Sequence, residues 1–374
     1  MISSIFARRS YQSETSPTNW VLHFVPGDGP NALIEAISRT EEIQVKILTL
    51  YNIDQTLPDY CVKNHVSLES LKFSSKQLRR QYIALIRYLI SKRPRVVFSH
   101  SFYPSLLCAA AAPLFPNTKF ISVRHHNKVH ILSNNKKAKL LDRFIASLSF
   151  HTIAVSEAVK TTMMIEGSKA SKISVIYNGL PNPHQKYRKM NEDRKDQPFL
   201  LIALGRIDWQ KNYEGMLESI ARIRSNGLDI KLKVLGSGND NYLNNLKELQ
   251  ATLGLKNVVE WLGRQSDIYP HLEEADLFIH AAVDEACPLV LIETMMYGIP
   301  IFSSNLGGCM DVLDGFYPGA DPRDIDSFAS YLSDCLQNLS ELQNYALNIS
   351  ETVIDRFSDV KMQVEYTKYA ISIL

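Results

Sequence analysis

Short apolar runs alternate with amphipathic stretches along most of the chain. The apolar runs, rich in β-branched and aromatic residues, are 20–25, 45–50, 95–99, 119–123, 151–155 and 173–177, then 199–204, 231–235, 258–262, 276–280 and 299–303. Stretches of helical period lie between most of them, including 32–39, 76–91, 213–225, 240–253 and 288–297. Strands that alternate with helices of this length predict βαβ units and parallel sheets. We therefore expect an α/β fold.

The alternation stops once, over residues 181–197, where the sequence is polar, contains proline and has no periodicity. This segment predicts a linker between an N-terminal domain over 1–190 and a second domain over 191–357. A separate helical stretch, 358–374, follows the last α/β unit. Ligands of doubly wound sheets bind at the carboxyl ends of the strands. We therefore expect the chemistry in the loops that follow the strands, facing a cleft between the domains.

Opposite charges on the two halves add a feature that the net charge of +2 conceals. Residues 1–190 hold 26 Lys and Arg against 11 Asp and Glu, a net +15, whereas residues 191–374 hold 15 against 28, a net −13. Basic amphipathic stretches at 76–87 and 136–143 favour an anionic membrane surface as partner of the first half. A solvated helix face, or attraction between the halves, is the alternative. No motif for nucleic acid is present.

Targeting signals and cysteines restrict the class further. No apolar run reaches the ~18 residues of a transmembrane helix, and the N-terminus lacks the apolar core of a signal peptide. We expect a cytoplasmic protein, peripheral at most on the inner face of the membrane. The five scattered cysteines, Cys61, Cys108, Cys287, Cys309 and Cys335, favour free thiols over disulfides or a zinc knuckle.

Candidate ligand-binding residues follow the strands of the second half. Arg206 and Lys211 lie in one loop before a helix, where two cations and free backbone N–H groups suit a diphosphate. Two solvated surface cations are the alternative. Gly205, Gly236 and Arg264 follow successive strands, and the glycines either admit a ligand close to the backbone or simply form turns.

The segment 284–293 carries two carboxylates on either side of a helix start. Pro288 suits the first helical position, and the N–H groups around Cys287, Leu289 and Val290 are free to hold phosphate oxygens. Glu293 lies off the apolar stripe of this helix and needs a partner, either a ribose diol or a nearby Lys or Arg. Glu285, just before the helix, is placed to accept hydrogen bonds from sugar hydroxyls.

Two features of the first half also follow strands. Gly27, Gly29 and Ala32 match the dinucleotide fingerprint, but Pro30 removes an N–H from it and Asp54 lies further on than the fingerprint requires. An NAD site over 27–32 is thus a weak interpretation of this loop. His125, or His126 in the next register, is placed to orient a hydroxyl or phosphate. Metal binding by these two is not expected, since no third ligand is evident.

The order and spacing of these motifs resemble glycosyltransferase family 4, whose members have the GT-B fold. The resemblance is carried by GRIDWQKN (205–212), VLGSG (234–238), VVEWLGR (258–264), ADLFIH (275–280), EACPLVLIETMMYGIP (285–300) and GGCMDV (307–312). AVSEAVK (154–160) and ISVIYNG (173–179) extend it into the first half. One departure is Ala286, where the family often has glycine.

The resemblance implies two Rossmann-like domains that face a central cleft, with a C-terminal helix crossing back to the first domain. It also implies roles for the residues in this cleft. Arg206 and Lys211 bind the donor diphosphate, Glu285 contacts the donor sugar, and Glu293 holds the ribose. The loop residues Ala286, Cys287, Pro288, Leu289 and Val290 contact sugar and phosphate, Gly205, Gly236 and Arg264 line the donor site, and Gly27, Gly29 and His125 approach from the first domain.

The activity implied is retaining transfer of a sugar from a nucleotide-sugar, UDP being the commonest carrier in the family, to a lipid-linked or cell-envelope glycan. The family needs no cofactor and no metal for this transfer. The alternatives are a GT-B epimerase or phosphorylase, an NAD-dependent oxidoreductase using residues 27–32, and a catalytically silent partner protein. Intact Arg206, Lys211, Glu285 and Glu293 argue against the last.

Overall fold

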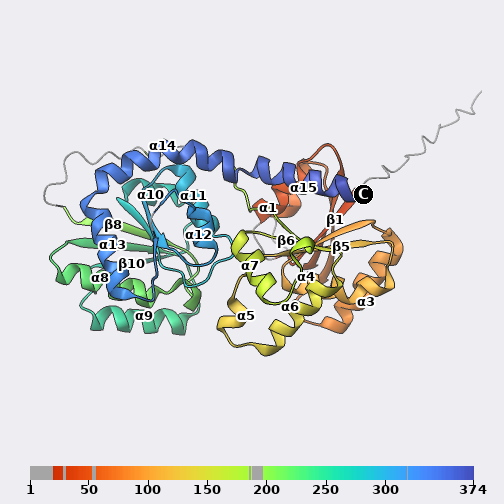
Figure 1. Ribbon diagram of the computed structural model, residues 1–374, viewed down its shortest axis with the longest axis horizontal. Helices are drawn as coiled ribbons and strands as arrows, with labels where there is room; N and C mark the ends of the chain where they lie inside the picture. The colour runs from red at the N-terminus through yellow and green to blue at the C-terminus, as the bar shows by residue number, and fades with distance from the viewer. Residues whose placement is uncertain (1–19, 28–30, 53–55, 185–186, 188–196, 318) are drawn as a thin grey trace, which may run out of the picture.

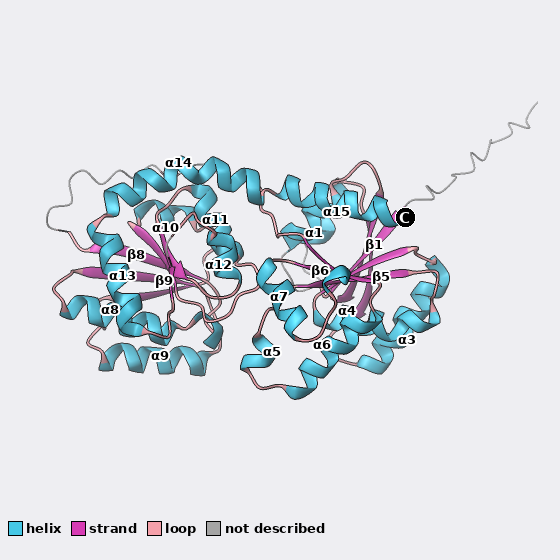
Figure 2. Ribbon diagram, viewed as in Figure 1, coloured by secondary structure: helices cyan, strands magenta, loops and turns pink. Residues whose placement is uncertain are grey.

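Two parallel sheets, each flanked by helices, form the two halves of the protein in a computed structural model (Figures 1 and 2). The structure describes residues 20–27, 31–52, 56–184, 187, 197–317 and 319–374. The strand order is β3-β2-β1-β4-β5-β6-β7 in the first sheet and β10-β9-β8-β11-β12-β13 in the second. Both are doubly wound orders, in which the order of the parallel strands along the chain reverses between β1 and β4 and between β8 and β11.

The bounds of the elements in the first domain are as follows. The strands are β1 Trp20–Val25, β2 Gln44–Tyr51, β3 Ser67–Phe73, β4 Val96–His100, β5 Lys119–Arg124, β6 His151–Ala154 and β7 Ile173–Val175. The helices are α1 Asn31–Ser38, α2 Thr56–Lys63, α3 Leu78–Lys92, α4 Phe102–Ala111, α5 Val129–Leu132, α6 Lys136–Leu148 and α7 Glu157–Ile165. The central strands β1, β4 and β5 are buried along almost their whole length and mostly apolar, because helices cover both faces of the sheet.

The second domain repeats this plan. Its strands are β8 Phe199–Leu204, β9 Ile230–Leu235, β10 Val259–Gly263, β11 Leu277–His280, β12 Ile301–Ser304 and β13 Gly319–Ala320. Its helices are α8 Tyr213–Ser225, α9 Asp240–Thr252, α10 Tyr269–Glu274, α11 Leu289–Tyr297, α12 Gly308–Leu313, α13 Ile325–Gln337 and α14 Leu339–Phe357, with a 3₁₀ turn η3 at Trp209–Lys211.

The last helix, α15 (Asp359–Ile373), crosses back to the first domain, as predicted (Figure 1). The extended Ser358 separates it from α14 and caps its N-terminus. Leu180 accepts a hydrogen bond from Asp359 N and donates one to Phe357 O, so the two chain crossings run side by side. Buried Met362 and Tyr366 of α15 pack into the core that includes residues of α1. The GT-B prediction is therefore confirmed at the level of the fold.

Three details differ from the sequence-based expectation. Strand β3 was not predicted, because its alternating SLESLKF sequence is only half-buried at the sheet edge. The two-residue β13 is too short to leave a pattern. Most of the expected linker lies outside the described residues, but its Tyr187 is buried and donates through its hydroxyl to Ala275 O at 2.8 Å. That residue packs on the second domain despite its polar neighbours.

All five cysteines are free, and four of them are buried, as expected from their scattered positions. Among the described residues, no helix combines the length and the apolar character needed to cross a membrane.

Candidate active site

The loops after β8, β9 and β10 meet at the carboxyl edge of the second sheet. They line an open hollow of about 510 Å³ that contains Gly205, Arg206, Gly236, Ser237, Gly238 and Arg264. A Cβ atom on Gly236 would lie 1.8 Å from the carbonyl oxygen of Gly205, so only glycine allows these loops to touch. The structure thus brings together four residues that the sequence predicted for the donor site.

Together with Arg264, Arg206 is one of two cations that line this hollow. Its side chain is 70% exposed, and its Nε donates to Asp208. Asp208 also accepts a hydrogen bond from Gln210 N at 3.0 Å and so caps the 3₁₀ turn η3 that carries Lys211. An exposed ion pair of this kind is weak. Arg206 is therefore free to exchange Asp208 for an anionic ligand.

Lys211 lies deeper and forms an ion pair with Glu285, and both side chains are 17% exposed. His280, at the end of β11, places its Nε2 atom 3.4 Å from Glu285 Oε1. Burial alone would raise the pKa of Glu285, but Lys211 and His280 outweigh it and lower the pKa to about 2. Glu285 is therefore an ionised acceptor at neutral pH, held between two nitrogen groups.

Helix α11 begins at Leu289, with Pro288 as its N-cap, one position later than the sequence suggested. The preceding loop is held by Gly308, whose N–H donates to Glu285 O at 2.9 Å. A Cβ atom on Gly308 would lie 2.1 Å from Ala286 O, so this contact also requires glycine. Ala286 does not have a positive φ, so its side chain fits the loop without backbone strain.

Glu293 of α11 is half-buried, and burial raises its pKa. A hydrogen bond from the Tyr269 hydroxyl opposes this effect. Among the described residues, Glu293 forms no ion pair with a Lys or Arg, which was the alternative to a ribose. The hydroxyl of Tyr269 is its partner instead. Tyr269 directly follows Ile268, which lines the donor-side hollow. Glu293 is thus connected to that hollow through Tyr269, although it does not itself line it.

A second cavity, of about 250 Å³, lies between the two domains. Gly27 and His125 line it from the first domain, Cys287 and Leu289 from the second, and Tyr366 from the crossing helix α15. The cavity thus joins the predicted residues of both halves. His125 rather than His126 faces it, since His126 turns toward Asp142. Gly29, the other glycine predicted here, lies outside the described residues.

Two buried histidines, His23 and His100, form a chain with the half-buried His125, which lines this cavity. His23 Nδ1 lies 2.9 Å from His100 Nε2, and His100 Nδ1 lies 3.3 Å from His125 Nε2. Burial lowers the pKa of His23 to about 3 and that of His125 to about 4, so the rings are neutral at pH 7. A neutral imidazole has one donor and one acceptor nitrogen. The tautomer of His23 therefore fixes whether His125 Nδ1 donates or accepts.

A contact between the domains borders the cavity. Asp284 accepts hydrogen bonds from Asn127 Nδ2 at 3.0 Å and from Lys128 N at 3.0 Å. Thr162 orients Asn127 by donating to its Oδ1 atom at 2.6 Å. Sequence reasoning missed Asp284 and Asn127, although each adjoins a predicted site residue or its alternative, Glu285 and His126. Together with the hydrogen bond from Ala158 N to Asp311, this contact joins the first domain to the donor side.

The comparisons with known proteins agree with this architecture. Residues 33–181 match the family model described as Glycosyltransferase Family 4, and residues 185–351 match that of Glycosyl transferases group 1. Together the two matches span most of the chain. The protein belongs to the GT-B glycosyltransferases of family 4. This membership argues against the alternative of an NAD-dependent oxidoreductase.

Individual relatives have low sequence identity to this chain. The chain is 27% identical over 221 residues to the lipopolysaccharide 1,6-galactosyltransferase of Salmonella typhimurium, and this match spans 56% of the chain and 57% of that enzyme. The Escherichia coli K12 protein of the same name is 22% identical over 83% of the chain and 84% of its own length. Anabaena HepE, solved in complex with UDP-glucose, superimposes with a TM-score of 0.78 over 95% of this chain and 100% of its own, at 18% identity.

Proposed function

We propose that the protein is a retaining glycosyltransferase that moves a sugar from a nucleotide-sugar to a lipopolysaccharide or other cell-envelope glycan. A UDP-sugar is the donor that we propose first. The observation that carries the proposal is the half-buried Lys211–Glu285 pair beside the Arg206 hollow and next to the interdomain cavity. The donor carrier is supported by the UDP-glucose complex of HepE, and the acceptor class by the names of the two lipopolysaccharide galactosyltransferases.

The residues act mainly through charge. When the bond between sugar and diphosphate breaks, negative charge grows on the leaving phosphate oxygen, and Arg206, Lys211 and the N–H groups before α11 are placed to stabilise it. Glu285 accepts from a donor-sugar hydroxyl, and Glu293 accepts from the ribose. In a front-face reaction, the acceptor oxygen forms the new glycosidic bond while its proton passes to the leaving phosphate. No metal takes part in this proposed step.

The acceptor side is proposed to dock on an anionic membrane through helices α3 and α6. On α6, the apolar Leu140 and Phe144 are 67% and 39% exposed beside Lys136, Lys137 and Arg143. On α3, Ile83 and Ile90 are 50% and 58% exposed in the same stripe as Arg79, Arg80 and Arg87.

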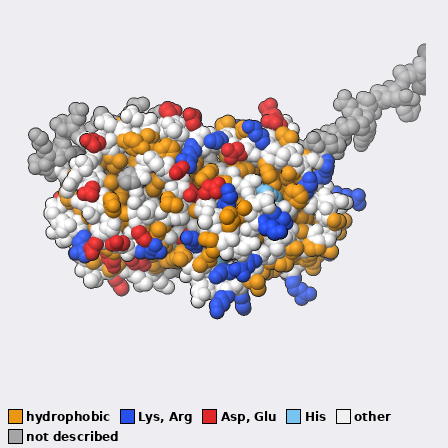
Figure 3. Space-filling model, viewed as in Figure 1, with side chains coloured by type: hydrophobic (Ala, Val, Ile, Leu, Met, Phe, Trp, Pro, Cys, Tyr) orange, Lys and Arg blue, Asp and Glu red, His pale blue; other side chains and the backbone are white. Residues whose placement is uncertain are grey.

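Helix α4 packs against both α3 and α6, so these helices share one face of the domain. Figure 3 shows Lys and Arg side chains gathered along the lower edge of the first domain, where Figure 1 places α6. Apolar side chains ringed by cations are typical of interfacial binding.

The donor site is tested by calorimetric titration of UDP, GDP and ADP in the presence of EDTA. We expect micromolar binding of one nucleotide to the wild type and its loss in Glu293→Gln. Ser225→Ala, on the outer surface of α8, is the matched control and should bind as the wild type does. If no nucleotide binds to the folded wild type, the proposed donor site is wrong.

The membrane surface is tested separately by co-sedimentation with liposomes. Binding should require anionic lipid and weaken with salt. Leu140→Ser with Phe144→Ser should reduce it while leaving nucleotide binding unchanged. Equal binding to neutral vesicles would contradict the electrostatic part of the proposal.

A further inference from the structure

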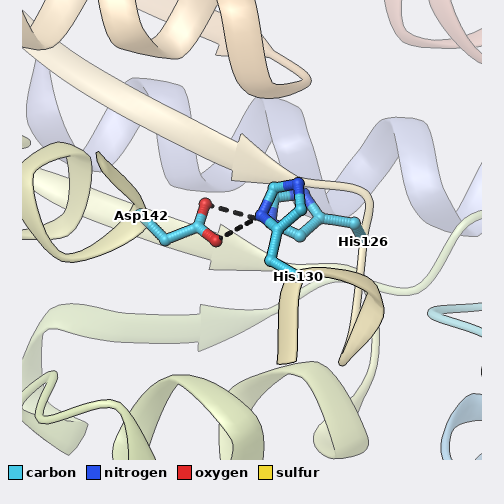
Figure 4. A group of neighbouring side chains, drawn as sticks. All are labelled: His126, His130 and Asp142. Atoms are coloured by element: carbon cyan, nitrogen blue, oxygen red, sulfur yellow. Dashed lines mark hydrogen bonds and ion pairs between the residues drawn. The ribbon is translucent and has the colours of Figure 1, made fainter. Parts of the chain in front are cut away.

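Three side chains from neighbouring elements converge behind the cavity histidine (Figure 4). His126 follows β5, His130 lies in α5, and Asp142 lies in α6. His126 Nε2 is 3.0 Å from Asp142 Oδ1, and His130 Nδ1 is 2.7 Å from Asp142 Oδ2. The ligand atoms of all three lie within 4.8 Å of one another. We propose that His126, His130 and Asp142 bind a divalent transition-metal ion of the Zn²⁺ class, outside the donor site.

The donor set selects the class of ion. Two imidazole nitrogens and one carboxylate oxygen suit Zn²⁺ and similar borderline cations, whereas Ca²⁺ and Mg²⁺ require more oxygen ligands. Bonds of ~2.0–2.1 Å in tetrahedral geometry leave neighbouring ligand atoms roughly 3.3 Å apart. The two observed His–Asp contacts, of 3.0 Å to Oδ1 and 2.7 Å to Oδ2, would lengthen slightly, and any wider separation within the 4.8 Å limit would shorten. Three protein ligands leave the fourth position for water.

The charges around the site favour a cation despite a nearby arginine. Arg124 Nη2 lies 4.0 Å from Asp142 Oδ2. However, Arg124 is already paired with Glu166 through two hydrogen bonds, of 2.5 and 3.2 Å, and both side chains are buried. The charges of Arg124 and Glu166 cancel, so the buried carboxylate of Asp142 leaves the cluster with a net negative charge. A divalent ion would compensate it.

Access and outer contacts also fit an ion site. The side chains of His126 and His130 are 19% and 20% exposed, while that of Asp142 is 3% exposed. An ion can therefore enter from solvent past the histidines and meet the carboxylate beneath them. The ring of Phe102 packs edge-on against both imidazoles, with centroids 6.1 and 5.1 Å away. Arg124 Nε donates to His126 O at 3.1 Å and orients the loop, as outer-shell groups do around metals.

The site has a structural consequence for the cleft. The four residues 125–128 include His125, which faces the cavity, and Asn127 and Lys128, which contact Asp284 of the second domain. An ion held by His126 would tie this loop to α5 and α6. The ion would thus stabilise the interdomain contact without touching the donor.

The test is metal binding by the full chain after removal of bound metal with a chelator. Co²⁺ is titrated first and followed by its visible absorption, and Zn²⁺ is then added in competition. We expect one ion per chain, a rise in melting temperature on binding, and displacement of Co²⁺ by Zn²⁺. Loss of an outer-shell partner alone typically weakens metal binding about 10–100-fold. His130→Gln removes a direct ligand and should weaken binding by at least as much. His151→Gln, which removes a partly exposed imidazole elsewhere, should bind as the wild type does.

Asp142→Asn is a second ligand variant, and its folding is checked by circular dichroism before titration. Because His130 is partly exposed, His130→Gln decides the question if Asp142→Asn fails to fold. Absence of a Co²⁺ spectrum in the wild type, or an unchanged spectrum in His130→Gln, would overturn the proposal. UDP titration of the same samples separates the two proposals, because His130→Gln should retain nucleotide binding.

Discussion

The Lys211–Glu285 pair allows a quantitative test of how the donor site is built. The pKa of Glu285 lies at about 2, against an ordinary value of 4.5, although burial acts to raise it. At ~1.4 kcal/mol per pH unit, this difference corresponds to ~3 kcal/mol of net stabilisation of the carboxylate, because Lys211 and His280 outweigh the effect of burial. Lys211→Met removes the larger partner and leaves a buried charge. We expect it to lower the free energy of unfolding by about 3 kcal/mol at pH 7.

A double-mutant cycle isolates the pair. In Lys211→Met combined with Glu285→Gln, no uncompensated carboxylate remains, so the double variant should lose less stability than the two single variants added together. We expect a coupling of about 2 kcal/mol, measured by urea unfolding followed by circular dichroism. Because the folded-state pKa of Glu285 is depressed, the wild-type advantage is complete above pH 4.5 and declines as the pH falls toward 2.

The control is the exposed pair Arg222–Asp326, whose side chains are 55% and 75% exposed in the same domain. Its cycle should give a coupling below about 1 kcal/mol, because solvent screens the charges. If the Lys211 and Glu285 substitutions are additive within about 0.5 kcal/mol, the two charges do not form the pair seen here. The reasoning about the donor site would then fail with it.

Three further predictions follow from the same geometry. Arg206→Ala should lower kcat by about 10²-fold or more by removing a donor to the leaving diphosphate, and near-normal turnover in a nucleotide-sugar assay would contradict this. The pKa of His23 is about 3 in the folded state and about 6.5 in the unfolded state, so only the unfolded chain binds this proton between pH 7 and pH 5. The wild type therefore loses stability over this range. His23→Asn should reduce that loss by about 2 kcal/mol, measured by urea unfolding at each pH. Gly236→Ala, whose Cβ would strike a carbonyl oxygen, should abolish nucleotide binding in calorimetry, whereas Gly227→Ala, also at positive φ but with open space around it, should cost only backbone strain.

The sequence predicted the two-domain α/β plan because buried parallel strands leave continuous apolar runs. It failed at β3, whose polar residues at the sheet edge conceal the strand. The donor-side residues Gly205, Arg206, Gly236 and Arg264 could be placed together because each directly follows a strand of the same sheet. Their roles in binding stay predictions until nucleotide titrations are made.

Other features depended on strand order, which local patterns do not reveal. His23 and His100 meet only because β1 and β4 are neighbours in the sheet, and each looks like a lone histidine in an apolar run. Likewise, His126 meets Asp142 only because α6 packs beside the loop after β5. The expectation that His126 has no third ligand nearby was therefore wrong, since His130 and Asp142 both reach it.

The return of α15 to the first domain sets an order of folding during synthesis. The first domain begins at the start of the described chain, yet Met362, Tyr366 and Ala370 of the last helix fill part of its core. Domains generally fold as units, the N-terminal one first. Here the N-terminal domain can collapse early but completes its packing only after the second domain has been synthesised. Until then the apolar side of α1 lacks the partner that covers it in the folded protein.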